Sequence, residues 1–226
     1  MYNLGEQFVF DYSKAKVRDK SVFTGNTYRI SVLTERLIRI EYNKNGVFED
    51  RPTELALFRN FDTPQFEVNQ DEKYIEITTK YFKLTYLKNT SISSTKNFRI
   101  SLLSTDKIWY YGNPEVRNLG YADNLEDVKK SDKRLKGLFS MDGFSSIDDS
   151  NSLVINQDGT LARRNNEEID MYVFLYRKDF NLCLNDYFAL TGKPPLVPRY
   201  ALGNWWSKNY AYTENDLNKL FLRFKK

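Results

Sequence analysis

The first half of the chain carries pairs of short segments in which hydrophobic and polar residues alternate. In the first pair, Tyr28, Ile30 and Val32 share one side, and a short polar break precedes the second segment. The three pairs are residues 28–33 with 37–42, 74–79 with 82–87, and 98–103 with 107–111. Because successive side chains of a strand point to opposite faces, each pair predicts a β-hairpin.

Residues 170–176 predict one further strand, which is rich in apolar residues. Many short strands with turn residues between them are typical of a β-sandwich or barrel. Residues 112–159 are less regular and are rich in Asn, Asp, Gly and Ser, so they predict a long loop in which short strands are left open. A loop of this size is usually functional or covers a partner domain.

The hydrophobic spacing changes from Asp179 onward. Apolar residues then recur every three to four positions from Phe180 to Leu190, and Gly192 follows them. This pattern predicts a helix with a glycine cap. The proline-rich residues 193–198 predict a linker after it.

Residues 199–226 differ from the rest of the chain. Residues 201–206 predict an apolar strand, and Thr213 predicts the N-cap of an amphipathic helix whose apolar face runs from Leu217 to Phe224. One strand–helix unit cannot bury its own faces. We therefore divide the chain into residues 1–192, the linker 193–198, and the opening of an incomplete barrel at 199–226. The exposed apolar face predicts either self-association into a homo-oligomer or packing on the first domain.

The composition removes several classes of chemistry. The chain has no histidine and one cysteine, Cys183, which excludes Ser-His-Asp and Cys-His catalysis, His-ligated metals and disulfide scaffolds. We expect no metal and no cofactor, so that any chemistry rests on carboxylates, Tyr, Lys or Ser. The aromatic content of 15% favours β-rich structure and is also compatible with sugar-facing surfaces.

The charge pattern gives no sign of a nucleic-acid partner. The net charge is +4, and the densest basic run, residues 129–136, contains an Asp and no aromatic residue for stacking on bases. We interpret this run as a solvated loop. Residues 1–10 show no basic segment followed by an apolar run, and no apolar run reaches about 18 residues. We therefore expect no secretory signal, a cytoplasmic location and no membrane partner.

Three segments in a fixed order carry a specific resemblance. Residues 48–53 read FEDRPT, residues 137–144 read GLFSMDGF and lead into IDDS at 147–150, and residues 187–207 contain LTGKPPLVPRYALG. These segments resemble the amino-terminal part of glycoside hydrolase family 31, the α-glucosidase and α-xylosidase group. The resemblance implies a β-sandwich of the galactose-mutarotase type, followed by a linker helix and the first unit of a catalytic (β/α)8 barrel.

The resemblance also implies a retaining mechanism with two Asp residues on later barrel strands. Such a pair stands about 5–5.5 Å apart. Neither of the segments that carry them is present in the 226 residues, so we assign no catalytic residue and expect this chain to be inactive alone. Asp148 and Asp149 are adjacent, and neighbours in an extended chain point to opposite faces. They predict a turn or a loop anchor.

The resemblance implies two substrate-binding residues, Asp142 and Tyr210. Asp142 aligns with an Asp on a sandwich loop that reaches toward the sugar pocket in some relatives, with a plain Asp–Gly turn as the alternative. Tyr210 follows the first barrel strand, where relatives place an aromatic residue against the sugar. Barrel active sites lie at the carboxyl ends of the strands, and an aromatic face can stack on sugar C–H groups. Trp205 and Trp206 predict barrel core.

The sequence thus favours the amino-terminal part of an α-glycosidase, most plainly an α-glucosidase that acts on small oligosaccharides. Its expected partners are the oligosaccharide substrate and the remaining barrel. The alternative is a non-catalytic carbohydrate-binding β-sandwich. A third role is structural: the sandwich packs on the barrel and shapes its mouth, which is compatible with the first.

Overall fold

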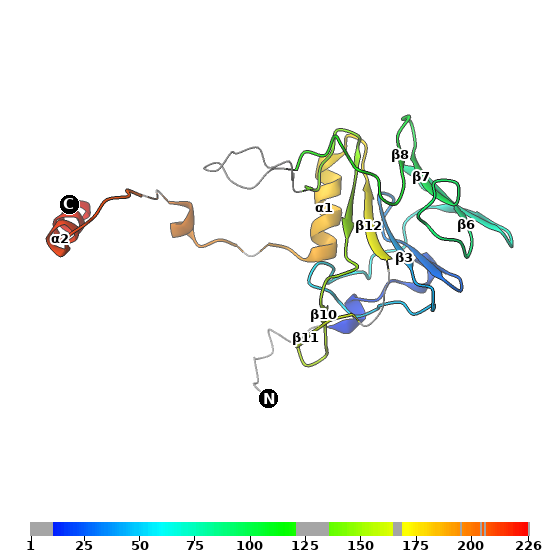
Figure 1. The fold of residues 1–226 in the computed structure, drawn as a ribbon, viewed down its shortest axis with the longest axis horizontal. Helices are drawn as coiled ribbons and strands as arrows, with labels where there is room; N and C mark the ends of the chain where they lie inside the picture. Colours follow the sequence, from blue (N-terminus) through cyan, green and yellow to red (C-terminus); the bar gives the residue numbers. More distant parts are fainter. Residues whose placement is uncertain are drawn as a thin grey trace. The chain divides into compact units, whose positions relative to one another are not determined.

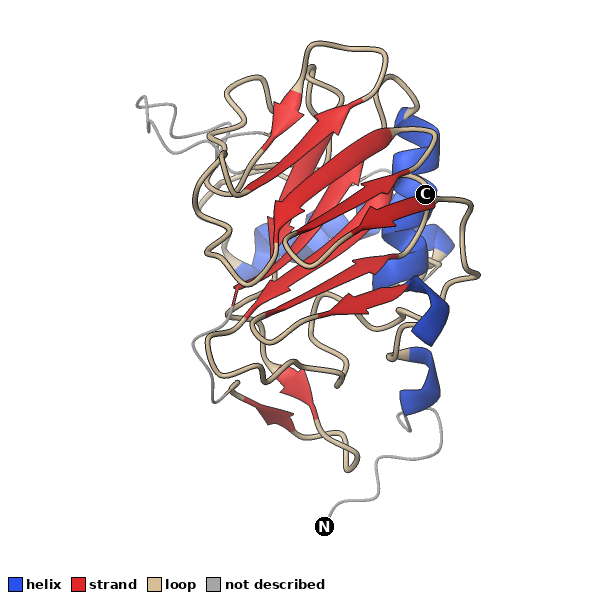
Figure 2. Ribbon diagram, turned by 90° about the vertical axis from the view of Figure 1, so that its right-hand side faces the viewer, coloured by secondary structure: helices blue, strands red, loops and turns tan. Residues whose placement is uncertain are grey.

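Segments with alternating residues in the first half of the chain, together with two later strands, form two antiparallel five-stranded sheets. The computed structural model describes residues 11–120, 136–164, 169–194, 196–203, 205 and 207–225. The chain divides into two units, Met1–Lys193 and Pro194–Lys226, and both sheets belong to the first (Figure 1). Figure 2 shows the strands of the first unit lying side by side.

The second sheet joins its strands in sequence order, whereas the first sheet inserts its latest strand between two earlier ones. The first sheet has the order β1 (Val22–Thr24), β2 (Tyr28–Val32), β3 (Leu37–Tyr42), β12 (Ile169–Leu175), β9 (Phe144–Asp148). The second has the order β4 (Glu67–Gln70), β5 (Tyr74–Thr78), β6 (Phe82–Leu87), β7 (Phe98–Leu102), β8 (Ile108–Trp109). A two-stranded ribbon pairs β10 (Val154–Ile155) with β11 (Leu161–Ala162). The three predicted hairpins and the late strand are confirmed.

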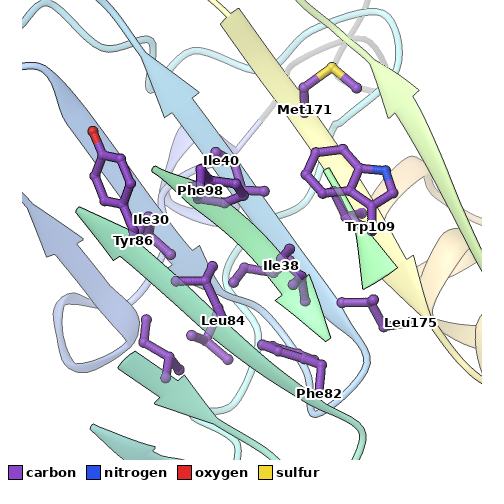
Figure 3. Close-up of a cluster of buried hydrophobic side chains, with 14 of the residues drawn as sticks. Ile30, Ile38, Ile40, Phe82, Leu84, Tyr86, Phe98, Trp109, Met171 and Leu175 are labelled. Atoms are coloured by element: carbon purple, nitrogen blue, oxygen red, sulfur yellow. The ribbon is translucent and has the colours of Figure 1, made fainter. Parts of the chain in front are cut away.

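The inner faces of the two sheets share one hydrophobic core. Ile30 stands opposite Ile40 in the first sheet, and Ile77 stands opposite Leu84 in the second. Figure 3 shows this cluster, in which Trp109 is buried beside Phe98 with ring centroids 6.2 Å apart. Aromatic edges packed on ring faces add to the gain from buried area, so the high aromatic content is largely structural.

A helix covers part of the outer face of the first sheet. Helix α1 (Phe180–Thr191) follows β12 directly, and its buried residues Cys183 and Leu190 join a second apolar cluster with Leu37 and Phe174. Gly192 ends the helix with φ +93°, and its N–H donates to the carbonyl of Phe188 at 3.0 Å. The predicted helix and its glycine cap are confirmed.

The rest of that outer face carries buried charge. Arg29, Glu41 and Asp170 stand side by side on β2, β3 and β12. Arg39 donates from Nε and Nη2 to the two carboxylate oxygens of Asp170 at 2.8 and 2.7 Å, and both side chains are almost fully buried. Arg29 makes a second two-pronged pair with Glu41, at 2.6 and 2.7 Å. Such paired geometry is what compensates for removing charges from water.

Two of the sequence motifs meet at this cluster. The carbonyl of Glu49 accepts hydrogen bonds from Arg29 and Arg39, and Asp149 accepts one from the hydroxyl of Thr53 at 2.8 Å. Arg164 bridges Asp149 and Asp170 at 3.1 and 2.9 Å. The segment at 48–53 and the segment at 147–150 are therefore tied to each other and to the sheet, and Asp149 is a buried loop anchor.

Burial and neighbouring charges shift the pKa values of Asp149 and Asp170 in opposite directions. Burial alone would raise the pKa of Asp170, but the attraction and hydrogen bonds of Arg39, helped by Arg164, hold that pKa well below its usual value. Burial and the nearby charge of Asp170 raise the pKa of Asp149. The cluster therefore keeps Asp170 ionised as the partner of Arg39.

The second unit contains the 3-10 helix η4 (Arg199–Leu202) and helix α2 (Glu214–Phe224). The predicted N-cap at Thr213 is confirmed, with a reciprocal hydrogen-bond pair to Asp216. The strand predicted at 201–206 is wrong for its described residues, which begin in η4 and continue without strand pairing. A barrel strand needs neighbouring strands to take its backbone hydrogen bonds, so local turn bonds form in their absence. The barrel stays a prediction.

The basic run at 129–136 lies outside the described residues except for Lys136, which is half-exposed. None of the described helices is long and apolar enough to cross a membrane.

Removal of Arg39 is expected to destabilise the first unit strongly. The Arg39→Met variant leaves Asp170 and Glu41 buried with too little positive charge, and we expect a loss of about 3–5 kcal/mol. Urea unfolding of the 226-residue chain measures the change. Lys83→Met is the matched control, because Lys83 pairs with Glu76 at 3.0 Å on the surface, where we expect a loss below about 1 kcal/mol. Equal losses in the two variants would contradict the prediction.

Candidate functional site

Asp142 lies at a cavity of about 470 Å³ at one end of the first sheet. Three turns line it: the turn after β7, the turn that leads into β9, and the turn after β12. Their lining residues are Ser104, Thr105, Asp106, Lys107, Met141, Asp142, Gly143, Arg177, Lys178 and Asp179. Because β9 begins where the antiparallel β12 ends, the last two turns come together at the same end of the sheet.

The Asp142 carboxylate is largely shielded from water and faces two cations. Its side chain is 11% exposed, with Oδ1 at 3.3 Å from Nη1 of Arg117 and 3.8 Å from Nζ of Lys107. Its backbone N–H donates to Oγ of Ser140 at 3.1 Å, and the N–H of Ser140 donates to the hydroxyl of Tyr176 at 2.6 Å. The turn therefore holds the carboxylate from both its backbone and its side chain.

Gly143 makes this turn possible. Its φ is +77°, and its carbonyl accepts hydrogen bonds from the N–H groups of Tyr176 and Arg177 at 2.9 and 2.8 Å. A Cβ atom at this position would stand 2.6 Å from the carbonyl oxygen of Arg177. Residues 142–143 thus form a tight Asp–Gly turn whose Asp also lines a cavity, and the sugar contact stays a prediction.

Two further lining residues have unusual backbone conformations. Ser104 and Arg177 have φ values of +62° and +56°, in the left-handed region that residues with a side chain rarely adopt. Arg177 is held by the ring of Tyr81, whose centroid lies 4.2 Å from its guanidinium, and the Tyr81 hydroxyl donates to Asp179 at 2.8 Å. Conformations of this kind cluster at functional sites and persist only where surrounding contacts enforce them.

The cavity offers hydrogen bonding rather than an obvious reaction. Its carboxylates accept hydrogen bonds, and the ammonium groups of Lys107 and Lys178 and the guanidinium of Arg177 donate them. Among the described residues, no group of three or more His, Cys, Asp or Glu side chains is arranged to hold a metal ion. Sequence motifs point to Asp142 alone. Lys107, Arg117 and Arg177 reach the site by tertiary folding, and no motif marked them.

Tyr210 lies in the second unit, so it is described apart from Asp142. Its side chain is exposed, its ring meets that of Tyr212 edge-on at 5.0 Å, and Nζ of Lys208 lies 5.0 Å from its centroid. The indole N–H of Trp205 donates to the carbonyl of Ala201 at 2.9 Å. Trp206 lies outside the described residues, and the barrel-core role of both tryptophans stays a prediction.

Comparison with known proteins finds similarity in fold. The cycloalternan-forming enzyme from Listeria monocytogenes, solved with a pentasaccharide substrate, is 16% identical with a TM-score of 0.53, over 88% of this chain and 23% of that chain. A GH31 dextranase from Flavobacterium johnsoniae, solved with glucose, is 15% identical with a TM-score of 0.48, over 80% of this chain and 28% of that chain. No family model and no curated protein matches the chain.

The chain spans about a quarter of the length of these solved enzymes. At this level of identity the similarity shows the fold alone. The resemblance to the amino-terminal part of family 31 is confirmed at that level.

A methyl group at residue 143 is expected to disrupt the Asp142 turn. Gly143→Ala combines a positive φ with a clash against the Arg177 carbonyl, and we expect a loss of about 2–4 kcal/mol. Gly159→Ala is the matched control, because Gly159 has a φ of +80° but no atom within 4 Å of the added Cβ. We expect about 1 kcal/mol there. Thermal and urea unfolding measure both, and a cost for Gly143→Ala no larger than the control would refute the close approach.

Proposed function

We propose that this chain is the amino-terminal sandwich portion of a retaining α-glycosidase, with α-glucosidase as the specific activity of the whole protein. The observation that carries the proposal is how two of the three family-like segments, 48–53 and 137–150, behave in the structure. Residues 48–53 and 147–150 lock together around Asp149, and residues 137–144 build the Asp142 turn. These segments resemble the family in sequence and also make defined structural contacts. Together, these two facts support a relationship to the family more strongly than the similar fold alone does.

In this proposal Asp142 binds a sugar hydroxyl. An ionised carboxylate accepts hydrogen bonds from hydroxyl groups, and a hydrogen bond to a charged group contributes about 1.5–3 kcal/mol. Arg117 and Lys107 hold the carboxylate in place. For the second unit, the proposal is that Tyr210 offers an aromatic face to a sugar.

The chemical step belongs to residues outside this chain. We propose two Asp residues on later barrel strands, one as nucleophile and one as acid/base, separated by the spacing of retaining enzymes. The residues described in this chain bind and orient the substrate and exclude water from one side of it. The alternative function, a non-catalytic carbohydrate-binding sandwich, is supported by the hydrogen-bonding character of the Asp142 cavity.

The DNA that follows the last codon gives the first test. We expect an open reading frame that continues into alternating strand and helix patterns, with an Asp at the end of at least two of the strands. This arrangement would supply the partners of α2 and the catalytic pair. A gene that stops at this point, or that continues into a sequence without these patterns, would contradict the proposal.

The second test is hydrolysis of an aryl α-glucoside. We expect none with the 226-residue chain and measurable turnover with the full-length protein. Asp142→Asn in the full-length protein should lower kcat/KM by about 10- to 100-fold, because a charge-assisted hydrogen bond is lost. Asp62→Asn is the control, since Asp62 is a well-exposed residue that pairs with Arg18 at 2.8 Å. Hydrolysis by the short chain, or an unchanged kcat/KM in Asp142→Asn, would count against the proposal.

A further inference from the structure

A second cavity opens along the free edge of the first sheet. Strand β9 is the last strand in that sheet, and residues 146–148 on it line a cavity of about 550 Å³. The other lining residues are Leu55, Tyr111, Gly112, Asn113, Lys136, Gly137, Leu138, Met171 and Tyr187. No residue is shared with the cavity at Asp142. The volume falls within the roughly 300–1,000 Å³ of small-molecule sites.

Hydrogen bonds fix the walls of this β9-edge cavity. The side chain of Asn118 accepts from the N–H of Gly137 and donates to its carbonyl, both at 2.9 Å. Lys136 donates to the carbonyl of Asn113 at 3.5 Å. The two segments that flank the strand edge are therefore joined to each other by hydrogen bonds.

A buried carboxylate stands behind the cavity wall and organises it. Glu115 has a φ of +48°, its side chain is fully buried, and it accepts hydrogen bonds from Ser146 and Asn118. Its carboxylate lies 3.9 Å from Nζ of Lys136. The charge of Glu115 thus orients Ser146 and Lys136, two lining residues. A strained, fully buried acid with this task is unusual outside a site.

The lining has the chemistry that recognises a neutral sugar. Tyr111 and Tyr187 supply aromatic surface, and Met171 and Ile147 supply apolar surface, to which the C–H face of a pyranose ring can pack. Asp148 accepts and Lys136 donates hydrogen bonds, which suits a ring of hydroxyl groups. One acid and one base balance each other, so the lining selects neither an anion nor a cation.

We propose that the β9-edge cavity is a saccharide-binding site, separate from Asp142. A site of this kind would hold a stretch of oligosaccharide on the sandwich without taking part in its hydrolysis. The choice of a saccharide rests on the proposed function as well as on the lining residues. The position of the site rests on the structure alone.

Titration of the 226-residue chain, labelled with ¹⁵N, with maltose and isomaltose tests the site. We expect saturable shifts of the amide signals of Gly112, Gly137 and Ile147. Asp148→Asn keeps the oxygen that accepts from Ser150 but loses the charge, and Tyr111→Leu removes a ring but keeps an apolar side chain. Each variant should raise the Kd about tenfold or more. Thermal unfolding checks that both variants fold.

Two controls separate this site from the one at Asp142. Asp62→Asn, on the exposed surface, and Asp142→Asn should both leave the Kd for the β9-edge cavity unchanged. Absence of saturable shifts with both sugars would overturn the proposal, as would shifts confined to residues 141–143 and 177–179 that disappear in Asp142→Asn. Unchanged binding in both Asp148→Asn and Tyr111→Leu would also overturn it. A downstream sequence without a barrel would refute the proposed enzyme and leave this binding result standing.

Discussion

The pair between Arg39 and Asp170 holds together parts of the chain that are 131 residues apart in sequence. It joins β3 to β12, and both side chains are buried on the outer face of the first sheet. Arg39 also donates to the carbonyl of Glu49, and this hydrogen bond attaches the loop that contains Glu49 to the sheet. A buried ion pair contributes little over an apolar pair of the same shape, but the loss of one partner is costly. The pair therefore fixes one arrangement of strands and loop.

Strand β12 connects the charge cluster to both cavities, through residues on the strand and directly after it. Asp170 stands near its start, in the charge cluster, and Met171 lines the β9-edge cavity. The strand ends at Leu175, and the next residues, Tyr176 and Arg177, hold the turn of Asp142 through the carbonyl of Gly143. Because β12 is paired on both edges, with β3 and β9, this one strand connects the charge cluster to the two cavities.

The periodic spacing of hydrophobic residues predicts the hairpins and α1 of this fold. It does not predict the very short strands or the buried charged residues. The hairpins and α1 follow from periods of two and about 3.6 residues, whereas β1 and β4 are too short to show a period. Arg39 and Glu41 alternate with isoleucines as solvated residues do, so their burial follows from tertiary contacts such as the loop at Glu49. Asp142 was found through a motif. Its partners Arg117 and Lys107 come from distant segments. The described residues of 201–206 begin in η4 and pair with no described strand.

A double-mutant cycle between Arg39 and Asp170 tests the central claim most directly. Arg39→Met, Asp170→Leu and the double variant are compared by urea unfolding at neutral pH. If the pair fixes the strand arrangement, the double variant will be more stable than the sum of the single losses predicts, by at least about 2 kcal/mol. Losses that add to within about 0.5 kcal/mol would show that the two side chains act independently, and would contradict the claim.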